Sequence, residues 1–217
     1  MTTAKTVAEK LLQIKAIRLN LQQPFTWASG WKSPIYCDNR KILSFPEVRD
    51  YIKSELANLV DTSHPGADVI AGVATAGIPH GVLVADLLKL PFVYVRSSPK
   101  DHGLGNRVEG FLEPGKKVVV LEDLVSTGRS SLQACEALKA AGAKVIGLIC
   151  VFHYGFDEAV SAFRAASIPV KSLCNYETLI QFAAEKNQVT SRQLDILEKW
   201  RESPGTWGEG DSVSKAP

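Results

Sequence analysis

The sequence predicts an α/β fold in which a parallel sheet carries helices on both faces. From about residue 68 to residue 152, short apolar runs alternate with longer segments of helical period, which is the pattern of successive βαβ units. Two of these runs, Val118–Leu121 and Val145–Phe152, are apolar at nearly every position, as expected of strands buried on both faces. The length of 217 residues fits one domain, and residues 1–202 are expected to form it.

The N-terminal part is predicted to contain two helices separated by an irregular stretch. Apolar side chains at helical spacing predict one amphipathic helix over residues 3–20: Val7, Leu11, Ile14 and then Ile17 or Leu19. Two prolines and a glycine between residues 24 and 34 break this period, and an extended segment begins at Ile35. Pro46 suits a first-turn position, so a second helix is expected from there to Leu59.

The remaining elements follow in order after a loop at residues 61–66. The predicted strands are 68–72, 92–95, 117–122 and 145–152, and the helices within this region are 79–88 and 130–141. Residues 97–114 form a glycine-rich excursion between the second and third strands. A helix at 157–166, a short strand near Val170 and helices at 175–186 and 190–201 complete the core. Residues 203–217 are rich in Gly, Ser and Pro, so a flexible tail is expected.

Composition excludes several classes of protein. The formal net charge is +2, and the 25 basic and 23 acidic residues are mixed along the chain, unlike the basic stripe of a nucleic-acid binder. The longest apolar stretch is far shorter than the roughly 20 residues of a membrane helix. The first twenty residues interleave charged and apolar positions, so no secretory signal is predicted. Four widely spaced cysteines without a Cys-x-x-Cys pair indicate a reduced, cytoplasmic protein.

The most informative segment is Val118–Ser130, in which an apolar strand, two carboxylates, a short turn and a helix follow one another. A strand-to-helix turn leaves backbone N–H groups unpaired, and the helix dipole makes such a turn a phosphate cradle. The segment lacks the Gly-x-x-x-x-Gly-Lys pattern of ATP-binding loops. Glu122 and Asp123 would repel a polyphosphate but would accept hydrogen bonds from sugar hydroxyls. The combination suits a ribose 5-phosphate, and the alternative is a solvated acidic pair before an ordinary helix.

Other polar residues fall at the same edge of the predicted sheet. Ligands of open α/β sheets gather at the carboxyl ends of the strands. Gly72–Ala74, Arg96, the acidic pair and His153 all occupy such positions, so one site assembled from four loops is expected. For His153 a structural role is the alternative.

The segment from Val118 to Ser130 resembles the phosphoribosyl-pyrophosphate (PRPP) motif of type I phosphoribosyltransferases. Three further stretches, 25–40, 72–79 and 96–103, resemble the orotate phosphoribosyltransferases. The resemblance implies a small hood at about residues 20–40 and a mobile catalytic loop at 97–114. It also implies a homodimer whose loop acts on the neighbouring subunit, and transfer of ribose 5-phosphate from PRPP to orotate in pyrimidine synthesis. Magnesium would be held mainly by PRPP, so no dedicated metal site is expected.

The resemblance also implies residue roles. Arg96, Lys100 and His102 would contact pyrophosphate, and Lys100 and His102 would neutralise or protonate this leaving group. Asp123 would act with them in catalysis, beside Glu122 on the ribose. Ser126 would approach orotate. The other motif residues expected to bind substrate are Leu124, Val125, Thr127, Gly128, Arg129 and Ser130. Of these, Thr127, Gly128, Arg129 and Ser130 would hold the 5-phosphate. In the hood, Tyr36 and Lys32 are expected to bind substrate.

This chain departs from the family pattern at several positions. Ala28, Ala76 and Ser97 stand where some family members carry lysine. Lys32 and Arg40 lie in the orotate-side segment and could pair with a carboxylate. A solvated surface charge is the alternative for both. Tyr36 is either a stacking face for the base or a half-buried strand aromatic. Arg129 replaces a small residue, and its guanidinium would add charge to the phosphate turn.

Two other functions are compatible with the fold. One is a phosphoribosyltransferase for a different base, because many base-specific enzymes share the PRPP motif. The other is a regulator that binds PRPP or nucleotides without catalysis. A regulator would need a DNA-binding domain or a basic RNA-binding face, and the sequence has neither. The cationic Lys100 and His102 also favour an enzyme.

Overall fold

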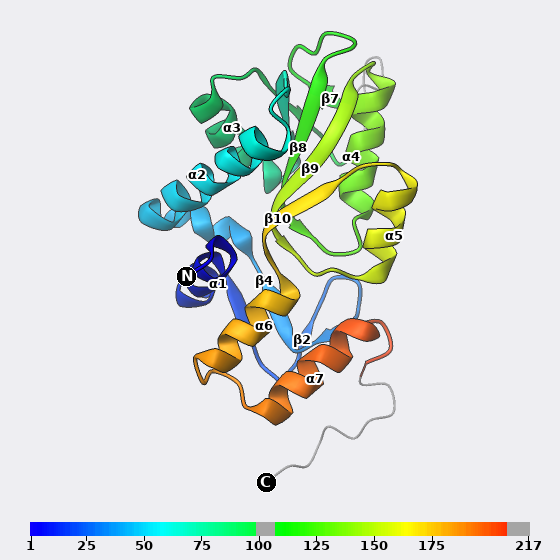
Figure 1. Cartoon of the computed structure of the whole chain (residues 1–217). Coiled ribbons are helices and arrows are strands. Elements are labelled where there is room, and N and C mark those ends of the chain that lie inside the picture. Colours follow the sequence, from blue (N-terminus) through cyan, green and yellow to red (C-terminus); the bar gives the residue numbers. More distant parts are fainter. Residues whose placement is uncertain (99–106, 208–217) are drawn as a thin grey trace.

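The computed structural model describes residues 1–98 and 107–207. Within these ranges, six strands form the main sheet in the order β10-β9-β8-β5-β6-β7 (Figure 1). All neighbouring pairs are parallel except β6 and β7, which are antiparallel. The strands are β5 (Val69–Val73), β6 (Phe92–Val95), β7 (Val108–Glu109), β8 (Lys117–Val125), β9 (Lys144–His153) and β10 (Val170–Asn175). The predicted α/β fold with a parallel sheet is confirmed.

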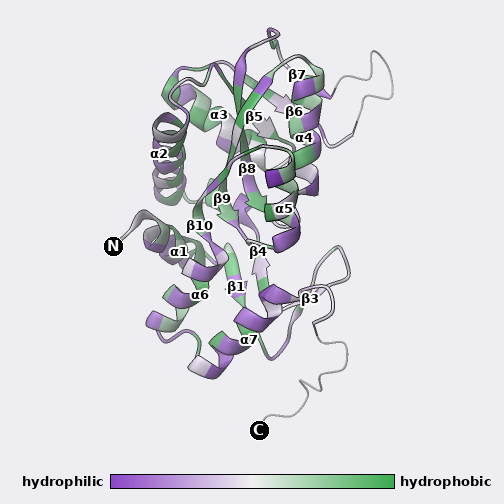
Figure 2. Ribbon diagram, turned by 45° about the vertical axis from the view of Figure 1, so that its right-hand side comes forward, coloured by the Kyte–Doolittle hydropathy of each residue, from purple (hydrophilic) through white to green (hydrophobic). Residues whose placement is uncertain are grey.

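Helices cover both faces of the sheet because the strands alternate their buried side chains. On β8, Val119 and Leu121 belong to the core shared with α2 (Pro46–Ser63) and α3 (Gly77–Leu88). Val118 and Val120 belong to a second core shared with α4 (Arg129–Ala140) and α5 (Asp157–Ala165). Each fully buried aliphatic side chain contributes roughly 1.5–3 kcal/mol to folding. In Figure 2 the helices carry both hydrophilic and hydrophobic residues, as expected of helices that cover a sheet.

Two glycines on one face of α3 allow this helix to lie against the sheet. A Cβ atom at Gly81 would lie 2.6 Å from the Phe92 ring, and one at Gly77 would lie 2.5 Å from the Leu121 carbonyl oxygen. Both distances are shorter than carbon contacts in packed proteins, so a side chain at either position would push α3 away. This close approach places the start of α3 beside Glu122.

A smaller lobe, here called the hood, lies at the carboxyl end of the sheet, below it in Figure 1. It contains two short antiparallel pairs, β1 (Ile17–Leu19) with β4 (Ile35–Cys37) and β2 (Phe25–Thr26) with β3 (Lys32–Ser33). The helices beside them are α1 (Thr3–Gln13), the 3-10 helix η1 (Asn39–Ser44), α6 (Tyr176–Glu185) and α7 (Ser191–Glu202). Segments from both ends of the chain therefore meet in this lobe.

The single opening helix predicted for residues 3–20 is wrong in its second half. The helix α1 ends at Gln13, Lys15 adopts a left-handed conformation with φ 54°, and Ile17 begins a strand. Pairing with β4 satisfies the backbone of this strand and buries the Ile17 side chain completely. Tertiary pairing has therefore overridden a helical spacing that local sequence alone favoured.

Other boundaries differ by a few residues. The helix α2 continues to Ser63 instead of Leu59, and α3 begins two residues earlier than predicted. Strand β8 runs to Val125 instead of ending at Glu122, so both carboxylates lie inside the strand. Residues 99–106 of the predicted mobile loop and residues 208–217 of the predicted tail lie outside the described residues. In the described part, no helix combines the length and apolar character needed to cross a membrane.

Candidate active site

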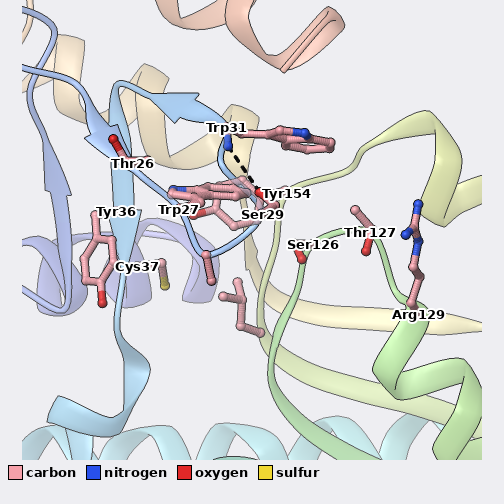
Figure 3. Close-up of a pocket in the computed structure, with 12 residues that line it drawn as sticks. Thr26, Trp27, Ser29, Trp31, Tyr36, Cys37, Ser126, Thr127, Arg129 and Tyr154 are labelled. Atoms are coloured by element: carbon pink, nitrogen blue, oxygen red, sulfur yellow. Dashed lines mark hydrogen bonds between the residues drawn. The ribbon is translucent and has the colours of Figure 1, made fainter. Parts of the chain in front are cut away.

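A cavity of about 870 Å³ lies between the hood and the turn that follows β8 (Figure 3). Hood residues bound one side, and Ser126, Thr127 and Arg129 bound the other. The lining residues are Thr26, Trp27, Ala28, Ser29, Trp31, Tyr36, Cys37, Leu124, Ser126, Thr127, Arg129 and Tyr154. The volume is in the range of pockets that enclose a small-molecule ligand.

The turn after β8 presents the beginning of α4 to this cavity. Gly128 is the N-cap residue and adopts φ +78°, a conformation that side chains other than glycine rarely allow. Leu132 N–H donates to the Gly128 carbonyl at 2.9 Å, which is the first helical bond. No side chain caps α4 within the described residues, so its leading N–H groups and its dipole are open to an anion.

The acidic pair lies near the end of β8, before this turn, and neither residue is among the described residues that line the cavity. Glu122 is 6% exposed, and its carboxylate accepts hydrogen bonds from Ser131 Oγ at 3.1 Å and from the Asp123 N–H at 3.1 Å. The Asp123 carbonyl oxygen accepts a bond from Asn39 Nδ2 at 2.7 Å, which joins β8 to the hood. Glu122 is thus bound within the fold, whereas the Asp123 residue is only partly buried.

Burial controls the protonation of the pair. Desolvation raises the pKa of Glu122 well above the ordinary glutamate value, and the charge of Asp123 adds to the rise. Desolvation also raises the pKa of Asp123, while a hydrogen bond between the two side chains opposes this rise. The pair therefore retains a proton to higher pH than two isolated carboxylates would, and the more deeply buried Glu122 is its natural holder.

Aromatic side chains form the hood wall of the cavity. The Trp27 and Trp31 rings stack with centroids 6.2 Å apart, and Tyr154 meets Trp27 edge-on at 5.1 Å. Trp27 Nε1 donates to the Ile35 carbonyl oxygen at 3.1 Å, which ties this wall to β4. Tyr36, the base-side aromatic that the sequence singled out, also lines the cavity. Its ring lies 5.5 Å from that of Phe25, with the Arg18 guanidinium 5.2 Å from both ring centres.

Lys32 and Arg40 lie near the cavity but are not among its lining residues in the described part of the chain. Lys32 Nζ donates to Thr26 Oγ1 at 2.8 Å. Arg40 pairs with Asp38 at 2.6 Å, and this bond holds the pKa of the Asp38 carboxyl below its usual value. Among the described lining residues, Arg129 carries the positive charge, and its guanidinium pairs with Glu158 at 2.9 Å.

Arg96 lies at the end of β6, where the chain leaves the sheet toward the predicted catalytic loop. Its N–H donates to the Arg107 carbonyl oxygen at 2.9 Å, and its guanidinium lies 3.7 Å from the Glu109 carboxylate. The Arg107 guanidinium donates to the carbonyl oxygens of Arg96 and Ser97, each at 3.0 Å. Both strands at the base of the loop are thereby fixed. Lys100 and His102 lie outside the described residues.

Two further titratable groups, His153 and Cys37, can be placed. His153 ends β9, and burial lowers the pKa of its imidazole, which favours the neutral form. Cys37 lines the cavity, but burial raises the pKa of its thiol well above the usual value, so it is not poised as a thiolate. In the described ranges, no group of three or more His, Cys, Asp or Glu side chains is arranged to hold a metal ion.

Comparison with known proteins identifies the family. The model of the phosphoribosyl transferase domain matches residues 39–182. An orotate phosphoribosyltransferase of Phocaeicola vulgatus is 52% identical over 209 residues, which cover 96% of this chain and 99% of the relative. One from Bacteroides fragilis is 54% identical over 203 residues, covering 94% of this chain and 96% of the relative. The chain belongs to the orotate phosphoribosyltransferase family.

Solved structures agree with this assignment. An orotate phosphoribosyltransferase from Aeropyrum pernix superposes with a TM-score of 0.74 at 25% identity, covering 85% of this chain and 99% of that one. A UMP synthase from Leishmania donovani gives a TM-score of 0.75 at 26% identity, covering 91% of this chain and 42% of that one. The type I phosphoribosyltransferase fold expected from the sequence is therefore confirmed.

Sequence reasoning missed part of the site of this orotate phosphoribosyltransferase family member. Trp27, Trp31 and Tyr154 line the cavity, although no role was predicted for them from the sequence. Trp27 and Trp31 lie in the hood stretch whose resemblance was noted, and two tryptophans four residues apart in a polar loop were an available signal. Tyr154 follows His153 at a strand end and offered no comparable signal.

Proposed function

We propose that this chain transfers the ribose 5-phosphate of PRPP to orotate, giving orotidine 5′-monophosphate and pyrophosphate in pyrimidine synthesis. The main observation behind the proposal is a cavity that has the N-terminus of α4, without a side-chain cap, on one side and the aromatic residues of the hood on the other. An anion and a flat ring can occupy such a cavity together. Membership in the orotate phosphoribosyltransferase family supports the same substrates.

The 5-phosphate is proposed to bind at the turn after β8. Thr127 lines the cavity, and Gly128, Arg129 and Ser130 lead into α4, whose first N–H groups point toward the turn. The helix dipole and these donors together stabilise a phosphate. Leu124 and Val125 connect this turn to the sheet and keep it in register with β9.

The ribose hydroxyls belong near the acidic pair. Asp123 is partly buried whereas Glu122 is buried, so we propose the Asp123 carboxylate as the acceptor of the ribose hydroxyls, while its backbone N–H donates to Glu122. Positive charge builds on the ribose ring in the transition state of such a transfer. A fixed carboxylate beside the ring stabilises this charge, which is the catalytic role proposed for Asp123.

Orotate belongs between the hood aromatics and Ser126. Tyr36 and Trp27 supply apolar faces for one pyrimidine ring, and the Ser126 hydroxyl lies on the opposite side of the cavity. Lys32, which is hydrogen-bonded to the lining residue Thr26, remains a proposed partner of the orotate carboxylate, as does Arg40.

The leaving pyrophosphate requires positive charge, because its negative charge grows as the bond to ribose breaks. Arg96 at the base of the loop, together with Lys100 and His102, is proposed to supply it. Magnesium, when bound with PRPP, would neutralise part of the same charge. Mg²⁺ usually keeps several waters and is bound through one or two carboxylates together with substrate phosphates, so the ion is proposed to be held mainly by PRPP, with Asp123 as a candidate carboxylate ligand.

The proposed setting and assembly follow the sequence-based expectations. The four cysteines are free, and burial raises the pKa of Cys135 and of Cys174 to about 12, so these two thiols are poorly reactive. A reduced, cytoplasmic setting is proposed from the cysteine spacing in the sequence. The proposed assembly is a homodimer in which the loop between β6 and β7 acts on the neighbouring subunit.

A spectroscopic assay tests the proposed function. Orotate absorbance is expected to fall when orotate, PRPP and magnesium are all present, with one pyrophosphate released per orotate consumed. The Asp123→Asn variant should lower kcat/KM by about 100-fold, because it removes a charge that acts in the transition state. Its unfolding transition should remain cooperative, because the carboxylate is not part of the apolar core. A folded variant with wild-type turnover would remove Asp123 from the mechanism.

A further inference from the structure

An ion pair at the rim of the cavity joins the phosphate turn to α5. Arg129, the first residue of α4, donates from Nη2 and Nε to Glu158 Oε1 at 2.9 Å and 3.2 Å. Glu158 lies in the first turn of α5, beside Asp157. The two side chains are 76% and 49% exposed. Both halves of the pair are therefore free to rearrange when a ligand arrives.

Arg129 lies where its ion pair with Glu158 can affect phosphate binding. Arg129 lines the cavity, and its backbone N–H belongs to the helix start on which the 5-phosphate is proposed to sit. The charge of its guanidinium is paired with Glu158. A phosphate at the turn consequently meets a carboxylate together with the guanidinium, so the net gain from Arg129 is reduced.

The surroundings of Glu158 allow it to release the guanidinium. Glu158 also borders a second cavity of about 250 Å³, whose lining includes Trp31 and Glu202. Its carboxylate can therefore be hydrated once it is unpaired. Exposed ion pairs are weak, so a phosphate dianion at a helix N-terminus can compete with Glu158 for the guanidinium.

We propose that Glu158 is a positioning residue that holds Arg129 and weakens binding of the 5-phosphate. The inference rests on the proposed function. The 5-phosphate does not react and is present in both PRPP and orotidine 5′-monophosphate. Tight binding of this group in every state would lower KM without raising kcat, and it would retard product release. By competing for Arg129, Glu158 favours exchange of product for new substrate.

The proposal predicts a specific pattern in substrate kinetics. Glu158→Gln should lower KM for PRPP and the inhibition constant of orotidine 5′-monophosphate by the same factor, about fivefold. The KM for orotate should stay unchanged, because the base lies on the other side of the cavity. Raising the salt concentration should shrink the effect, since both charges are exposed. A purely structural loss would not separate the two substrates in this way.

Matched variants isolate the pair. Asp157→Asn removes a neighbouring charge from the same helix turn and should leave all these constants unchanged. Arg129→Ala should weaken binding of ribose 5-phosphate, and Glu158→Gln should then have little additional effect in the Arg129→Ala background. Ribose 5-phosphate binding measured by titration calorimetry provides a readout that does not depend on turnover.

The outcomes separate this inference from the proposed function. Tighter ribose 5-phosphate binding by Glu158→Gln, lost in the Arg129→Ala background, supports the inference. Unchanged or weaker binding by Glu158→Gln overturns it, even if the wild-type protein consumes orotate normally. An equal gain with and without Arg129 also overturns it, because Glu158 would then act on the phosphate directly. Failure of the wild-type protein to consume orotate with PRPP would instead remove the proposed function.

Discussion

At the scale of single residues, the end of β8 places two adjacent carboxylates in different environments. Glu122 is bound by Ser131 and by the backbone of Asp123, whereas Asp123 is only partly buried and remains the proposed partner of the ribose. The sequence identified both residues and assigned both to sugar hydroxyls. It could not show that one is held inside, because that depends on where α4 brings Ser131.

The buried pair should make stability depend on pH. The folded-state pKa of Glu122 is raised above its unfolded value, so the folded protein binds more protons above roughly pH 4.3. Its stability contribution is present below the unfolded pKa and is lost as pH rises through the folded pKa. Glu122→Gln, which resembles the protonated side chain, should therefore flatten the fall of melting temperature with rising pH. An unchanged pH profile in this variant would show that Glu122 is ionised in the fold.

At the scale of elements, the hood wall depends on a helix from the far end of the chain. The short β2–β3 hairpin makes no pairing with the main sheet. The Trp200 indole on α7 is completely buried, donates to the Lys32 carbonyl oxygen at 3.1 Å and meets the Trp27 ring at 5.6 Å. Helix α7 therefore determines where the aromatic side of the cavity lies.

Replacing Trp200 should loosen the hood more than the sheet. Trp200→Phe retains an aromatic ring but leaves the Lys32 carbonyl unpaired, at a cost of about 1–3 kcal/mol. The KM for orotate should rise several-fold while the KM for PRPP changes little. Tyr176→Phe is the matched control, because it removes a buried bond to the Leu197 carbonyl in the same aromatic cluster without touching the hairpin. Equal effects of the two variants on orotate would show that general loss of stability is responsible.

Helices and strands were predicted correctly where the local sequence pattern favours the same structure as the tertiary packing. Strand β6 and helix α5 match their predicted positions to within a residue, because each has a clear period and clear breaks. The strand β1 was missed because its partner β4 lies about twenty residues away and the apolar spacing suits a helix equally well. The phosphate turn could be predicted since its chemistry is local in sequence. The hood wall could not, because it is assembled from residues near 30, 154 and 200.

At the scale of the whole molecule, the cavity lies between two parts of the fold (Figures 1 and 3). The sheet contributes the turn after β8, where the 5-phosphate is proposed to bind, and the hood contributes the aromatic residues proposed to contact the base. The loop that supplies Lys100 and His102 leaves the sheet between β6 and β7, at its opposite edge from β10. The action of this loop on the neighbouring subunit is a proposal taken from the family resemblance.

Subunit mixing tests this arrangement. Lys100→Ala and Asp123→Asn chains should each be nearly inactive, because each lacks one part of every site. After subunit exchange, one site of a mixed dimer would carry both substitutions and the other neither, so partial activity should return. If exchange is confirmed by mass and no activity returns, the loop acts on its own subunit.

The central claim is that the cavity accepts orotate as the base and PRPP as the donor, and base selectivity tests it most directly. The measurement is kcat/KM for orotate, uracil, hypoxanthine and adenine under the same PRPP and magnesium concentrations. A site that pairs a cation with the orotate carboxylate rejects a base that has no carboxylate, because the cation is then left unpaired. The account predicts turnover with orotate and a value at least about 10³-fold lower for the other three bases. Comparable turnover with a purine would contradict the assignment of orotate, and comparable turnover with uracil would show that the carboxylate is not recognised.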